Sequence, residues 1–111
     1  VGDEEKNAEA MAKKIAQIRI FEDAAGKMNL SVREAGGEVL LISQFTLCGD
    51  CSHGNRPSFT AAARPEQAKP LYEYVAKLLS DYGLVVRTGV FGADMKIEQH
   101  NDGPVTIIYE C

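Results

Sequence analysis

The sequence has no tryptophan, only three cysteines and no long run of apolar residues. A helix that crosses a bilayer needs roughly 18 to 20 mostly apolar residues, so no membrane-spanning segment is expected. The first residues, Val1 to Lys6, are acidic and lack the basic-then-apolar pattern of a secretory leader. Three cysteines are too few, and odd in number, for the disulfide framework of a small secreted protein. We therefore expect a cytoplasmic protein.

Positive charge is also scarce, because 12 Lys and Arg residues face 16 Asp and Glu residues, for a net charge of −4. A protein that binds DNA or RNA indiscriminately uses a basic face with many phosphate contacts. The charge argues against such a protein and leaves open one that touches a single RNA end. With 111 residues, 45% hydrophobic and 25% charged, the chain is expected to form one globular domain, marginal in stability unless it oligomerises.

Two segments carry helical periodicity. From about Asp3 to Arg19, apolar residues recur at spacings of three and four, which predicts an amphipathic helix. A second helix is predicted before Gly83, a typical C-terminal stop. Its start is open, because both Pro65 and Pro70 suit a first turn and an interior proline costs about 3 kcal/mol. The residues that form its apolar face are Leu71, Tyr72, Val75, Leu78, Leu79 and Tyr82.

The remaining apolar segments read as strands. A short hairpin is expected around residues 24–27, a central strand within 38–47, and strands at 84–87, 95–99 and 105–109, the last two joined by a turn at 101–103. Residues 48–57 are rich in glycine and small polar residues, which predicts an exposed loop. The predicted fold is mixed α and β, with two helices packed on a mostly antiparallel sheet or barrel-like layers.

The sequence offers little familiar catalytic chemistry. Cys48-x-x-Cys51 followed by His53 could be half a zinc site or a redox pair, but His100 and Cys111 do not supply a second ligand pair. No Gly-x-Ser-x-Gly elbow, Walker loop or Gly-x-Gly-x-x-Gly occurs. We therefore expect no metal and no cofactor.

Two segments are unusual for a purely structural role. Ser43 to Thr46 places polar side chains directly after a buried apolar run, where the strand either emerges into solvent or contributes to a site. Asn101 to Thr106 contains Gly103-Pro104 at the entrance of a predicted strand. Proline there removes a ladder donor and can adopt a cis bond, although an ordinary turn is the simpler interpretation.

Four blocks together carry a family resemblance: SQFTL at 43–47, RPSFTAAA at 56–63, TGVFGADM at 88–95 and NDGPVT at 101–106. Their order and spacing resemble the D-aminoacyl-tRNA deacylase family, formerly called D-tyrosyl-tRNA deacylase. Residues 14–31 are also similar to the family's first helix and following strand. Because members begin with further strands, the resemblance implies an N-terminally incomplete chain with an exposed sheet edge and a partly exposed core.

The resemblance implies a homodimer that hydrolyses the ester of D-aminoacyl-tRNA and glycyl-tRNA, a chiral proofreading activity. Its implied catalytic residues are Ser43, Gln44, Phe45 and Thr46, with main-chain amides near Phe45 and Thr46 as oxyanion donors. Thr46 either positions water and substrate or is the nucleophile, and the sequence leaves both open. The residues implied in substrate binding are Phe91, Met95, Asn101, Gly103, Pro104 and Thr106, with the Gly-Pro pair, expected in cis, reaching into the partner's pocket.

Two alternatives remain at this point. The chain could resemble an animal-type relative that removes L-alanine from threonine tRNA and has a trans Gly-Pro pair. The residues Gln44 and Phe45 favour the D-specific branch instead. The chain could also be an inactive fragment that binds an RNA end.

Overall fold

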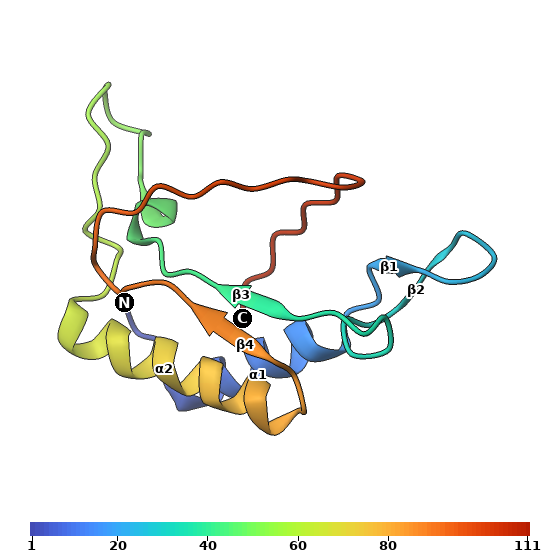
Figure 1. Cartoon of the computed structure of the whole chain (residues 1–111). Helices are drawn as coiled ribbons and strands as arrows, with labels where there is room; N and C mark the ends of the chain where they lie inside the picture. The colour runs from blue at the N-terminus through green and yellow to red at the C-terminus, as the bar shows by residue number, and fades with distance from the viewer.

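The computed structural model describes residues 1–111 and is a mixed α and β structure, as predicted (Figure 1). Its two helices lie against each other beneath a small sheet, and a long C-terminal segment makes a wide excursion before returning close to that sheet. No helix has the length and apolar character needed to cross a membrane. In chain order the elements are α1 (Glu5–Gln17), β1 (Phe21–Glu22), β2 (Met28–Leu30), β3 (Val39–Leu41), the 3-10 helix η1 (Phe45–Cys48), α2 (Pro65–Asp81) and β4 (Val86–Thr88).

The two helices pack through small side chains on α1. Ala8, Ala12 and Ala16 are buried and spaced by four residues, so they share one face of the helix. Small residues on that face leave room for Leu79 of α2, whose side chain is fully buried. Only seven residues of the chain are buried, so this contact forms most of a small core. The helix predicted from Asp3 to Arg19 is confirmed, two residues shorter at each end.

The structure shows which of the two prolines begins the second helix, α2. It begins at Pro65, and Pro70 lies inside it. Pro65 at the first position costs little, because the first amides of a helix have no intrahelical acceptor. The helix stops before Gly83, which has a φ of 85° and donates its N–H to the Ser80 carbonyl at 2.9 Å. The predicted glycine stop is confirmed, since a positive φ is easily adopted only by glycine.

The predicted hairpin is confirmed as the antiparallel pair β1 and β2. Asp23 organises its turn: the Asp23 Oδ1 accepts the backbone N–H groups of Ala25 at 2.9 Å and Lys27 at 3.0 Å. The N–H of Lys27 is the main reason that the pKa of the Asp23 carboxyl lies below its ordinary value. Gly26 has a φ of 75°, which completes the turn.

The prediction of a mostly antiparallel sheet is wrong for the second pair of strands. β3 and β4 are parallel, with Val39 opposite Val86 and Leu41 opposite Thr88. Parallel strands need a crossover connection, and α2 provides it between them. The central strand predicted within 38–47 is correspondingly short, because the chain leaves β3 after Leu41 and forms η1 at Phe45.

The strands predicted at 95–99 and 105–109 are absent, whereas β4 overlaps the strand predicted at 84–87 only at Val86 and Arg87 and extends to Thr88. Alternating apolar residues give these segments strand propensity, but a strand forms only when a neighbouring strand accepts its hydrogen bonds. No such neighbour lies beside them, and Ile107 and Ile108 remain exposed. In place of the turn predicted at 101–103 the chain has a bend at Asp102 and Gly103.

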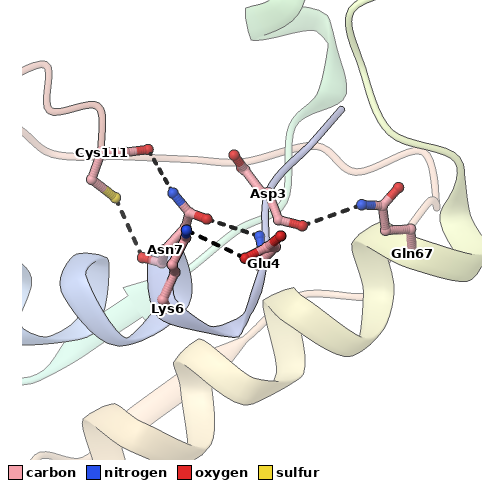
Figure 2. Close-up of polar contacts among 6 residues, drawn as sticks. All are labelled: Asp3, Glu4, Lys6, Asn7, Gln67 and Cys111. Atoms are coloured by element: carbon pink, nitrogen blue, oxygen red, sulfur yellow. Dashed lines mark hydrogen bonds and ion pairs between the residues drawn. The ribbon is translucent and has the colours of Figure 1, made fainter.

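The end of the C-terminal segment is tied to the start of α1 (Figure 2). The Asn7 side chain accepts the N–H of Glu4 at 2.8 Å and donates to the Cys111 carbonyl at 3.1 Å. The Cys111 thiol donates in turn to the Asn7 carbonyl at 3.3 Å. Gln67 of α2 donates to the Asp3 carbonyl at 3.2 Å, so both helices hold the first residues of the chain.

An apolar cavity of about 420 Å³ lies between α1, β3 and the returning C-terminal segment. Leu40 and Ile107 border it, and both are more than half exposed. This exposure agrees with the expectation that part of the core is uncovered. Its other main lining residues are Met11, Ile15, Ile18, Val39 and Tyr109.

Candidate active site

The polar residues after β3 form the exposed start of η1. Gln44 precedes this helix in extended backbone, and its side-chain amide donates to the Thr46 hydroxyl. Neither a histidine nor a carboxylate hydrogen bonds to that hydroxyl. Thr46 is therefore held by Gln44 and not by an ionisable side chain. Of the four residues from Ser43 to Thr46, only Ser43 is partly covered.

The backbone at this point offers unused donors. The first amides of a 3-10 helix have no carbonyl within the helix to accept them. Outside the regular elements, no backbone hydrogen bond uses the N–H of Phe45 or Thr46. Two neighbouring amides are thus free to bind an oxygen atom of a ligand.

The RPSFTAAA block lies against η1. The rings of Phe45 and Phe59 meet edge to face, with centroids 5.4 Å apart and planes at 76°. Asp50 and Ser58 close the intervening loop through two backbone hydrogen bonds of 2.8 and 2.9 Å. A Cβ at Gly49 would come within 3.1 Å of the Phe59 ring, so glycine is what allows this approach. The exposed loop predicted at 48–57 is confirmed.

The TGVFGADM block lies against the end of β3. A Cβ at Gly89 would be 2.6 Å from the Met95 Sδ and 3.1 Å from the Ile42 Cδ1. Met95 and Ile42 therefore close over Gly89, and Ile42 directly precedes Ser43. The segment 88–95 thus packs against the residue that leads directly into 43–46.

The residues of the fourth block, 101–106, do not lie beside η1 of their own chain. Asn101, Gly103, Pro104 and Thr106 are all exposed. In Figure 1 the turn of the C-terminal segment lies well away from η1. The Gly103–Pro104 peptide bond is cis, as predicted. The Gln99 side-chain amide donates to the Asn101 Oδ1 at 2.5 Å, and the His100 Nε2 lies 3.2 Å from the Glu98 Oε1.

The side chains of the cysteine loop form no cluster of three or more metal-ligating groups. Cys48 and Cys51 are free and exposed, and the His53 Nδ1 lies 2.9 Å from the Ser52 hydroxyl. No group of three or more His, Cys, Asp or Glu side chains is arranged to hold a metal ion.

Tyr72 makes two contacts that the sequence does not predict. The periodicity places it on the apolar face of the second helix, and the structure shows that it contacts both Leu41 and Phe91. A phenol hydroxyl on an apolar helix face needs a hydrogen-bond partner when it is covered. That requirement was the available signal, but it does not identify the partner.

Comparison with known proteins identifies the class. A family model described as D-Tyr-tRNA(Tyr) deacylase matches residues 1–110. The D-aminoacyl-tRNA deacylase of Brevibacillus brevis is 59% identical over 97% of this chain and 74% of its own length. That of Geotalea uraniireducens is 57% identical over 98% of this chain and 70% of its own length.

A solved structure has a similar fold. The c-Myc DNA Unwinding Element Binding Protein is similar with a TM-score of 0.86 and 40% identity, over 96% of this chain and 73% of that one. The class is therefore that of ester hydrolases acting on aminoacyl-tRNA. The chain belongs to the D-aminoacyl-tRNA deacylase family, and its activity is the hydrolysis of the ester bond of D-aminoacyl-tRNA in tRNA proofreading.

Proposed function

We propose that the exposed start of η1, together with the segment from Gly89 to Met95, is the deacylation site of this chain. The observation that carries the proposal is the hydrogen bond from Gln44 to Thr46 beside two free backbone amides. The family relationship identifies the reaction as ester hydrolysis. The Thr46 hydroxyl and the two backbone amides are groups suited to that reaction. Ser43 and Phe45 are proposed to be catalytic residues beside Gln44 and Thr46. Phe91 and Met95 are proposed to bind the aminoacyl group.

The reaction requires a water oxygen to bond to the ester carbonyl carbon while the bond to the ribose oxygen breaks. The proton lost by water is taken up by that leaving oxygen. The amides of Phe45 and Thr46 are suited to stabilise the negative oxygen that develops on the carbonyl. Because the Thr46 hydroxyl has no base beside it, we assign it to positioning, with the vicinal 2′-hydroxyl of the RNA assisting proton transfer.

Replacing Thr46 by Ala is expected to lower the rate of D-Tyr-tRNA deacylation about tenfold, because one positioning contact is lost while the backbone donors remain. Thr46→Ser keeps the hydroxyl and should retain most of the rate. Single-turnover kinetics with rapid quench and mass spectrometry measure both. Complete loss in Thr46→Ala together with a trapped acyl-threonine in the wild type would instead make Thr46 the nucleophile.

Substrate preference distinguishes the proposal from its alternatives. D-Tyr-tRNA and glycyl-tRNA are expected to be hydrolysed, whereas L-alanyl-tRNA(Thr) should decay at the rate of the enzyme-free blank. Preferential loss of L-alanine would identify the animal-type activity. Binding of tRNA without any hydrolysis would identify an RNA-end-binding protein.

We further propose a cytoplasmic homodimer of single-domain chains in which Gly103 and Pro104 of one subunit face the partner's site. The support is the family resemblance together with the exposure of these residues, and the turn of the C-terminal segment lies apart from η1 of the same chain (Figure 1). Activity per chain should therefore fall on dilution as sedimentation velocity reports dissociation. Undiminished activity in a sedimenting monomer would contradict this arrangement.

A further inference from the structure

We propose that Tyr72 is a positioning residue for deacylation: its hydroxyl fixes the end of β3, and its ring fixes Phe91. The proposal rests on the site assigned above, because Leu41 leads into Ser43 and Phe91 belongs to the segment that holds the aminoacyl group. It adds a residue of α2 to a site otherwise built from two loops.

The hydroxyl contact is specific. The Tyr72 Oη donates to the Leu41 carbonyl at 2.7 Å in a partly buried position. Leu41 is the last residue of β3 and pairs with Thr88 at the end of β4. From there the chain passes through Ile42 and Ser43 to η1. The hydrogen bond therefore fixes the peptide group from which the catalytic segment departs.

The ring contact reaches the other half of the site. The rings of Tyr72 and Phe91 have centroids 5.7 Å apart and a tilt of 50°, a geometry that is favourable for aromatic pairs. Phe91 lies in a turn, with the N–H of Ala93 donating to the Val90 carbonyl at 3.2 Å. A turn of this kind holds its side chain less firmly than a helix does. The Tyr72 ring supplies a fixed surface for it.

A single side chain on a regular helix thus touches both segments that must keep a fixed distance from each other. Sites need their reacting groups held closely, and a small misplacement lowers the rate strongly. The two contacts of Tyr72 are separable, because the hydroxyl holds Leu41 and the ring holds Phe91.

The chain also offers a matched control two residues further along α2. Tyr74 is half-buried like Tyr72, and its hydroxyl donates to the Glu9 carboxylate of α1 at 3.0 Å. Its removal costs one hydrogen bond between the two helices and none at the proposed site. Comparison of Tyr72→Phe with Tyr74→Phe therefore separates a positioning role from general stabilisation.

The experiment measures kcat, KM and Tm for the wild type, Tyr72→Phe, Tyr72→Leu and Tyr74→Phe with D-Tyr-tRNA. Tyr72→Phe should lower kcat about fivefold with KM and Tm close to those of Tyr74→Phe, the loss expected for one hydrogen bond. Tyr72→Leu should also raise KM severalfold, since Phe91 loses its support. Backbone NMR should report a shift of the Ile42 amide in Tyr72→Phe and not in Tyr74→Phe.

Equal kcat and KM in Tyr72→Phe and Tyr74→Phe would overturn the proposal. The Thr46→Ala variant in the same assay separates this outcome from failure of the site itself. A loss in Thr46→Ala without one in Tyr72→Phe removes only the role of Tyr72. An unchanged rate in Thr46→Ala removes the assigned site and the role of Tyr72 with it.

Discussion

Replacement of Leu79 by Ala is expected to lower the free energy of unfolding by about 2–5 kcal/mol. The Leu79 side chain is fully buried between α2 and the alanine face of α1, where it contacts the cluster that includes Ala12, Val32 and Leu84. Truncation removes apolar contacts and leaves a cavity that the helices cannot fully close. Because domains of this kind have only about 5–15 kcal/mol of stability, the loss should be visible as a large shift in a urea unfolding curve.

The control for this prediction is Ile108→Ala. The Ile108 side chain is 87% exposed, so its truncation should change the free energy of unfolding by less than about 0.5 kcal/mol. Equal effects of the two substitutions would mean that the α1–α2 contact is not the core.

Gly89→Ala is expected to lower kcat/KM for D-Tyr-tRNA at least about tenfold. The added methyl group would come to 2.6 Å from the Met95 Sδ, and a real contact of that length does not occur. Met95 has a flexible thioether, so it moves aside and the fold survives. The displaced side chain then no longer lines the proposed site, which costs transition-state binding.

A double-mutant cycle tests this cause. In a Met95→Ala background the 2.6 Å clash is removed and only the 3.1 Å approach to the Ile42 Cδ1 remains, so adding Gly89→Ala should change kcat/KM by less than about twofold. Losses that simply multiply would show that Gly89 acts independently of Met95. Melting curves of all four proteins check that folding is retained.

Local features of this protein followed from the sequence. The three-and-four spacing from Asp3 to Arg19 predicted α1 to within two residues at each end, because residues three and four apart share one face of a helix. Gly83 ended α2, and Gly26 lay in the hairpin turn, since glycine adopts a positive φ without steric cost. Four short blocks in order predicted the family, which the comparisons confirmed.

Pairing between distant segments was decided only by the tertiary structure. The apolar run at 39–42 predicted a strand but not that α2 returns the chain to pair it in parallel with β4. Alternation at 95–99 and 105–109 predicted strands that lack a neighbour, and the start of α2 depended on whether Pro70 could lie within it. The contacts of Tyr72 with Leu41 and Phe91 join residues 31 and 19 positions apart. Periodicity records which face of an element is apolar, whereas the partner of that face is chosen by the packing of the whole chain.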